Sequence, residues 1–218
     1  IFEEGGSAET VGIPRAFIEI AWRRYTKHSR NKAQEIQGAI LPLAERFSEH
    51  RPFLGVVLGG VFTEGSLKQL RSHGFAVLYF PYDSVIGAFA DAGIDACFDE
   101  ATSDSQLQKK VRAYEKLSKR KRQGIAIHLR KNRQAELADF IESLKNTLTR
   151  RISTIYVLPL HGSPRTLERI EEAISYIQEF DESQPRGLFV RFEVGVRYTN
   201  RDEVRGQFCT KKKAVAFL

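Results

Sequence analysis

Two short, almost entirely apolar runs, separated by a helix-length segment, constrain the fold of this chain most strongly. They are FLGVVLGG at residues 53–60 and FAVLYF at residues 75–80, and the segment between them ends at Gly74. A continuous apolar run of this length is typical of a strand buried on both faces, and glycine commonly ends a helix. Residues 82–93 predict another helix. Buried strands that alternate with helices predict an α/β fold with a central mixed, largely parallel sheet flanked by helices.

A further strand is predicted upstream, over residues 15–24, because its side chains alternate between two faces. We expect the face of Ala16, Ile18, Ile20 and Trp22 to point to the core and the face of Phe17, Glu19, Ala21 and Arg23 to be more polar. Thr26 or Ser29 can cap the helix that follows, which we expect to reach Phe47 with a kink at Pro42.

The composition of the chain changes near residue 104. Residues 104–151 hold 14 Lys and Arg against 5 Asp and Glu, and predict two amphipathic helices separated by SKRKRQG. Beyond them we expect a strand at 152–160, a helix capped by Ser163, and strands at 188–198 and 203–208 joined as a β-hairpin. The chain therefore divides into an α/β core (1–103), a basic helical segment (104–151) and a C-terminal β-α-β-β segment (152–218) that could extend the same sheet.

The overall composition favours an anionic partner. The formal net charge is +7, the isoelectric point is about 9.5 and hydrophobic residues make up 42% of the chain, a balance typical of a folded domain that binds nucleic acid. No apolar run has the length of a membrane span. Cys97 and Cys209 fit no metal-binding spacing, so we expect reduced thiols and a cytoplasmic protein. The chain begins at Ile1 without Met, and we expect its natural N-terminus to lie upstream.

Charged residues gather where the predicted strand meets the next helix. Glu19 lies on the strand, and Lys32 and Glu35 share one face of the helix at spacing i, i+3. Magnesium in proteins is commonly held by one or two carboxylates together with substrate phosphates, and a nuclease also needs a cation near the developing charge. The lysine expected two residues after Glu19 is replaced by Ala21, so a lysine of the helix would have to take its place. The alternative is a solvated corner in which Glu19 pairs with Arg23.

This arrangement resembles the PD-(D/E)XK nuclease superfamily, which includes type II restriction endonucleases, over roughly residues 1–80. The resemblance implies a restriction-endonuclease-like core and Mg²⁺-dependent endonuclease activity on DNA in a restriction or defence system. It implies Glu19, Lys32 and Glu35 as catalytic residues, with Glu19 and Glu35 on the metal, and an additional acidic residue upstream, where only Glu3 and Glu4 are available. It also implies a homodimer, since cutting both strands needs two sites.

Other charged groups extend the hypothesis to DNA contacts. Residues that we expect to contact phosphates without reading sequence are Lys27, Arg30, Lys119, Arg120, Lys121, Arg122 and Lys131; the alternative is a solvated connection between helices. His161, Ser163 and Arg165 could hold a phosphate at a helix N-terminus, and His28 could act as a general base. The alternative function is a nuclease-like module without catalysis that binds DNA or assembles a larger complex.

Overall fold

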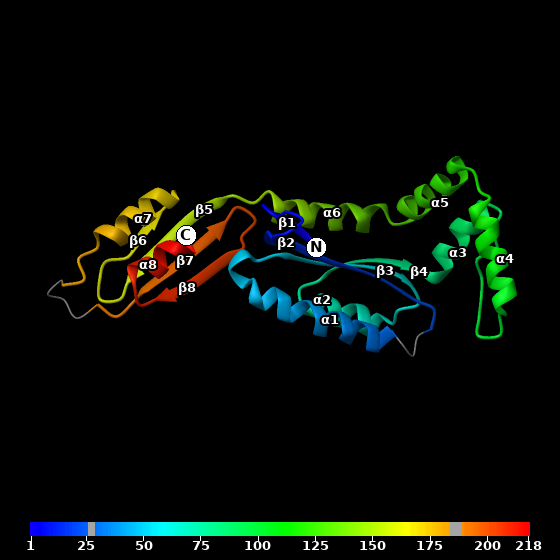
Figure 1. Cartoon of the computed structure of the whole chain (residues 1–218), viewed down its shortest axis with the longest axis horizontal. Coiled ribbons are helices and arrows are strands. Elements are labelled where there is room, and N and C mark those ends of the chain that lie inside the picture. The colour runs from blue at the N-terminus through cyan, green and yellow to red at the C-terminus, as the bar shows by residue number, and fades with distance from the viewer. Residues whose placement is uncertain (26–28, 184–188) are drawn as a thin grey trace. The chain divides into compact units, whose positions relative to one another are not determined.

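The computed structural model describes residues 1–25, 29–183 and 189–218. Within them the chain forms α1–α8, one short 3-10 helix (η2) and eight strands, in two sheets (Figure 1). In chain order these are β1 Phe2–Glu4, β2 Ile13–Arg23, α1 Ser29–Arg46, η2 Ser48–His50, β3 Phe53–Gly60, α2 Glu64–Ser72, β4 Ala76–Pro81, α3 Tyr82–Asp91, α4 Asp104–Glu115, α5 Lys119–Asn132, α6 Gln134–Leu148, β5 Ile152–Pro159, β6 Arg165–Leu167, α7 Ile170–Glu179, β7 Phe192–Tyr198, β8 Glu203–Phe208 and α8 Lys211–Phe217.

The first sheet confirms an α/β fold with a mixed sheet. Its strand order is β1-β2-β3-β4. The β1–β2 pair is antiparallel and the β3–β4 pair is parallel, the latter in the register Val57 to Leu78. The parallel pair is joined through α2, as the two apolar runs and Gly74 predicted; Gly74 has a φ of 83°, a left-handed conformation that favours glycine. The sheet is thus mixed, and nothing in it establishes a restriction-endonuclease-like core.

The second sheet is separate and entirely antiparallel, in the order β6-β5-β7-β8. The C-terminal segment therefore does not extend the first sheet, although the predicted hairpin of β7 and β8 is present. Side chains of β5 and β7 alternate between the core and the open face. The core side packs against α7 and α8 through Ile155, Val157, Ala173, Ile177, Phe192, Val194, Val196 and Ala214.

The chain divides into two compact units, neither of which is one continuous stretch. The first unit consists of residues 1–16, 43–53 and 145–218, and the second consists of residues 17–42 and 54–144. The predicted segments 1–103 and 104–151 each supply residues to both units, whereas 152–218 lies within the first.

The prediction of which face of β2 is buried is wrong for the C-terminal half of the strand. Ile20 and Trp22 are 76% and 41% exposed, whereas Phe17 and Ala21, on the opposite face, are only 3% and 9% exposed. A strand with apolar residues on both faces does not identify its covered face from alternation alone. As a result, Glu19 lies on the more deeply buried face of the strand.

Two helical predictions also need correction. The stretch SKRKRQG does not separate two helices, because Ser118 caps α5 and residues 119–124 are helical, so residues 104–148 form three helices. The helix predicted from Ser163 begins only at Ile170, since Arg165–Leu167 pairs with β5 as strand β6. Among the described residues, no helix combines the length and apolarity that crossing a membrane requires.

Candidate functional site

The predicted site residues of β2 and α1 come together in the second unit. The helix buries Ala33, Ile36 and Ile40 along one side, at the spacing of an amphipathic helix. Ion pairs from Lys32 to Glu19 and from Arg23 to Glu35 place its first turns beside the end of β2. Glu19 on β2 and Lys32 and Glu35 on α1 consequently face one another, and Arg23, four residues further along the strand, joins them. We call these four residues the acid–lysine cluster.

Lys32 lies between the two carboxylates. Its Nζ is 3.6 Å from Oε1 of Glu19 and 3.3 Å from Oε2 of Glu35. Nη2 of Arg23 lies 3.4 Å from the same Glu35 oxygen. The lysine side chain is 20% exposed, less than either glutamate. Lys32 of the helix therefore contacts Glu19, the contact that a lysine at position 21 would be expected to make. Arg23 pairs with Glu35 and not with Glu19.

The cluster offers hard oxygen ligands, but few of them. Glu19 and Glu35 suit Mg²⁺, which takes one or two protein carboxylates and completes its shell with water and phosphate oxygens. Within the described ranges no group of three or more His, Cys, Asp or Glu side chains could hold a metal. The residues present thus fit a magnesium ion that is shared with a substrate phosphate, and do not form a closed protein site.

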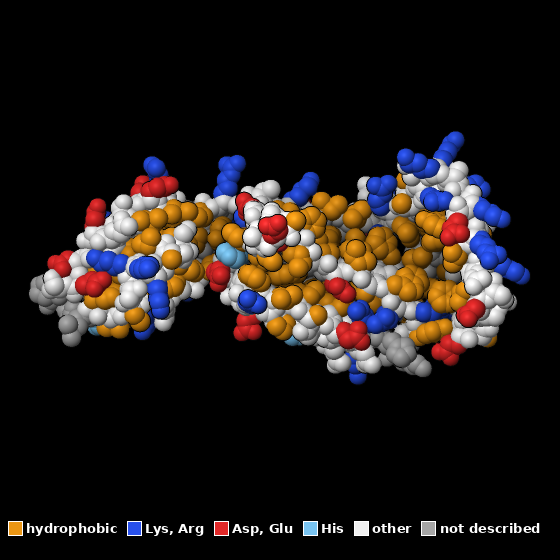
Figure 2. Space-filling model, viewed as in Figure 1, with side chains coloured by type: hydrophobic (Ala, Val, Ile, Leu, Met, Phe, Trp, Pro, Cys, Tyr) orange, Lys and Arg blue, Asp and Glu red, His pale blue; other side chains and the backbone are white. Residues whose placement is uncertain are grey.

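The predicted DNA-contacting residues lie in different places. Lys27 and His28 fall outside the described residues, and Arg30 is exposed in the first turn of α1. Lys119, Arg120, Lys121 and Lys131 are exposed on α5, and Figure 2 shows Lys and Arg side chains projecting from the end of the second unit that holds α4 and α5. Arg122 instead joins these helices: its Nη2 and Nε donate to the carbonyls of Glu115 and Leu117.

The first turn of α5 concentrates positive charge where a helix least favours it. Residues 119–122 are all Lys or Arg, and the turn contains no acidic residue. The N-terminus of a helix carries a partial positive charge, so basic side chains there are mildly unfavourable for stability. An anion bound at this turn would relieve that repulsion.

The predicted phosphate site around His161 does not form. His161 has a φ of 72° in the turn after β5, and Arg165 begins β6. The next helix begins at Ile170, so Ser163 caps no helix; its carbonyl instead accepts a hydrogen bond from the Tyr176 hydroxyl at 2.6 Å.

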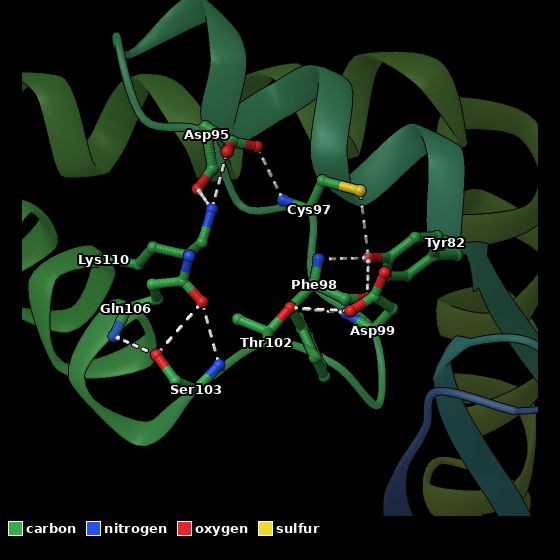
Figure 3. Close-up of polar contacts among 9 residues, drawn as sticks. All are labelled: Tyr82, Asp95, Cys97, Phe98, Asp99, Thr102, Ser103, Gln106 and Lys110. Carbon is green, nitrogen blue, oxygen red and sulfur yellow. Dashed lines mark hydrogen bonds and ion pairs between the residues drawn. The ribbon is translucent and has the colours of Figure 1, made fainter.

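A network of hydrogen bonds fixes the loop between α3 and α4, a feature without a clear sequence signal (Figure 3). The Tyr82 hydroxyl donates to the carbonyl of Phe98 at 3.3 Å and accepts from its amide at 3.1 Å. Lys110 Nζ lies 2.6 Å from the Asp95 carboxylate, and this hydrogen bond lowers the pKa of Asp95. Ser103 and Gln106 form a capping box at the start of α4. The loop is thereby held against α3, on the side where Tyr82 lies.

The position of Phe98 in this loop creates a pocket beside the acid–lysine cluster. It has a volume of about 510 Å³ and is bounded by the end of β2, the start of α1 and the loop, with Glu35 and Arg23 on its wall. Phe98 is nearly eighty residues away in sequence from Trp22, which also lines the pocket. No local sequence pattern predicts that these two side chains meet.

Comparison of the chain with models of known protein families, with curated proteins and with solved structures found no match in any of the three. The resemblance to PD-(D/E)XK nucleases therefore depends on the residues of β2 and α1 alone.

Proposed function

We propose that this protein is a magnesium-dependent DNA endonuclease that acts in a restriction or defence system. The observation that carries the proposal is the position of Lys32, whose ammonium group contacts both Glu19 and Glu35. A strand carboxylate and a helix carboxylate can hold a hard metal ion, and a cation within 4 Å of both can stabilise charge that develops on a phosphate.

Each residue of the cluster has a role in this proposal. Glu19 and Glu35 would hold the metal through their carboxylate oxygens, and Mg²⁺ bound there would supply Lewis-acid stabilisation of the phosphate and a more acidic water. Lys32 orients the attacking water and neutralises charge that develops on the phosphate oxygens. Arg23 holds Glu35 through its guanidinium at 3.4 Å, which positions that carboxylate.

The basic surface of α5 supports DNA as the substrate. Lys119, Arg120 and Lys121 are exposed at a helix N-terminus, where the helix also favours phosphate. Such contacts give affinity without sequence readout. We therefore expect DNA affinity to fall steeply as salt concentration rises.

The alternative is a DNA-binding or assembly module without catalysis. It is favoured by Ala21 at the expected lysine position and by the small number of carboxylates in the cluster. In that case the acid–lysine cluster is a structural ion-pair network at the corner between β2 and α1.

Plasmid cleavage separates these two functions. The full chain is incubated with supercoiled DNA and Mg²⁺ or Mn²⁺, beside Glu19→Gln and the matched control Glu45→Gln, which changes an exposed glutamate at the other end of α1. We expect cleavage by the wild type and by Glu45→Gln, and at least a hundredfold loss in Glu19→Gln, with DNA binding unchanged. Binding by all three proteins without cleavage under either metal supports the module instead.

A further inference from the structure

The pocket beside the acid–lysine cluster is walled by aromatic rings. Trp22, Tyr25 and Phe98 line it, and polar groups from Arg23, Asn31 and Glu35 complete the wall. Its volume of about 510 Å³ lies within the range of small-molecule sites. Because it shares Glu35 and Arg23 with the cluster, anything bound in the pocket lies next to the proposed site of hydrolysis.

Trp22 is held with much of its indole exposed. Its ring lies 6.0 Å from that of Tyr82, centroid to centroid, and 41% of the residue is accessible. Gly59 on the neighbouring strand provides the space behind it, since a Cβ at Gly59 would lie 2.8 Å from Cε3 of Trp22. A large apolar ring that is positioned by its neighbours and still exposed is suited to stacking with a ligand ring.

Arg24 also lines the pocket, among aromatic rings. Its guanidinium carbon lies 4.0 Å from the centre of the Tyr82 ring, and its Nε donates to the Phe98 carbonyl at 2.6 Å. Tyr82 is itself fixed by its hydrogen bonds with Phe98 (Figure 3). These contacts hold the guanidinium in place before any ligand arrives, which lowers the entropic cost of a ligand contact with it.

Arg23, which lines the pocket, has one donor that lacks an acceptor in the described part of the chain. Nε of Arg23 is buried and has no hydrogen-bond partner among the described residues. Unsatisfied buried donors are rare because each costs free energy. Asn31 is exposed at the start of α1 and carries both a donor and an acceptor. A ring with carbonyl and amino groups on its edge would meet stacking surfaces and hydrogen-bonding groups in this pocket.

We propose that the pocket binds one unstacked nucleobase of a single-stranded DNA segment, adjacent to the phosphate at the acid–lysine cluster. The inference rests on the proposed function and names its substrate class: DNA with an unpaired nucleotide at the cleavage position. A base inside a paired duplex is stacked on both faces and reaches such a pocket only after it is extruded, which costs a few kcal/mol. The protein therefore prefers single strands, flaps or frayed ends over a continuous duplex.

The fluorescence of Trp22 tests this directly, because the chain contains a single tryptophan. The full chain is titrated with a 12-nucleotide single strand and with the duplex of the same sequence, in EDTA so that no cleavage occurs. We expect saturable quenching by the single strand and at least tenfold weaker quenching by the duplex. Equal quenching by both, or none by the single strand, overturns the proposal.

Variants separate stacking from general DNA affinity. Anisotropy of a labelled single strand is measured for Trp22→Ala, Trp22→Phe and the matched control Ile20→Ala, an exposed apolar residue on the same face of β2. We expect roughly tenfold to hundredfold weaker binding for Trp22→Ala, a smaller loss for Trp22→Phe and no change for Ile20→Ala. Asn31→Ala, a surface change that should not affect folding, is expected to weaken binding severalfold.

The two proposals fail in different ways. Quenching by single-stranded DNA without cleavage in Mg²⁺ leaves the base pocket in place and removes the nuclease. Cleavage of duplex and single strand at equal rates, with Trp22→Ala as active as the wild type, removes the base pocket and leaves the nuclease.

Discussion

Replacing Lys32 with methionine should change metal affinity and catalytic rate in opposite directions. The substitution keeps most of the side-chain length and removes the charge that lies 3.3 Å from Glu35 and 3.6 Å from Glu19. If both carboxylates hold Mg²⁺, the Lys32 ammonium group repels the metal ion, although it also stabilises the charge that develops on the phosphate during hydrolysis. Its removal should therefore strengthen metal binding while it slows hydrolysis.

The size of each effect follows from the distances. A monovalent and a divalent cation 4 Å apart repel by about 2 kcal/mol in water, and salt reduces this to about 1 kcal/mol, equivalent to roughly fivefold tighter Mg²⁺ binding. Loss of one group that stabilises developing charge lowers the rate by about 100- to 1,000-fold. Folding stability should fall by only about 1 kcal/mol, because the ion pairs are partly exposed.

Calorimetric titration of Mg²⁺ without DNA, plasmid cleavage at saturating Mg²⁺ and urea unfolding measure the three quantities. The matched control is Lys68→Met, which removes an exposed lysine of α2 in the same unit. Weaker or unchanged metal binding in Lys32→Met, together with cleavage within threefold of the wild type, would refute the reasoning. A loss of stability alone would identify the cluster as a structural ion-pair network.

Three other changes test separate parts of the structure. Gly59→Ala places a Cβ 2.8 Å from the Trp22 ring, so we expect a shift in the tryptophan emission maximum and weaker binding of single-stranded DNA. Arg150→Met removes a cation that is 3% exposed and hydrogen-bonded to two backbone carbonyls, and should lower the free energy of unfolding by about 3 kcal/mol in urea. Asp95→Asn removes a carboxyl whose pKa is lowered by Lys110; its contribution is present at neutral pH and is lost as pH falls through the lowered pKa, so the variant should lose less stability than the wild type between pH 5 and pH 3.

Each of these predictions has a control in the same part of the chain. Gly38→Ala, in α1, meets no atom within 4 Å and should raise stability slightly. Arg151→Met changes the exposed neighbour of Arg150, and Glu100→Gln changes an exposed carboxyl near Asp95. A control that matches its test variant in emission, unfolding free energy or acid response would show that the named contact is not the cause.

The sequence predicts best the elements whose hydrophobic pattern fits only one kind of secondary structure. The apolar runs of β3 and β4 allow no polar face, and Gly74 marks the end of the helix between them. The covered face of β2 does not follow from the sequence pattern, because Ile20 and Phe17 are both apolar and lie on opposite faces, yet they are 76% and 3% exposed. The charge of residues 119–122 favours a connection between helices, whereas in the structure Ser118 caps α5 and these residues form its first turn.

Some residues of the candidate site could likewise be predicted from the sequence, and others could not. Lys32 and Glu35 could be placed near Glu19 because a helix that directly follows a strand returns its first turns to the strand end, and i, i+3 spacing puts both on one face. Phe98 and Tyr82 had no local signal, since their position depends on a loop fixed by contacts distant in sequence. Proximity along the strand favours a Glu19–Arg23 pair in the alternative interpretation, but in the structure Arg23 pairs with the helix carboxylate of Glu35.

The interleaving of the two units sets an order in which a ribosome can complete them. The second unit uses residues 17–42 and 54–144, so its last residue is synthesised 74 residues before Leu218. The first unit needs residues 145–218 to join segments made much earlier, 1–16 and 43–53. Domains fold as they are synthesised. The acid–lysine cluster can therefore assemble on the nascent chain before β5 and β7 have been synthesised.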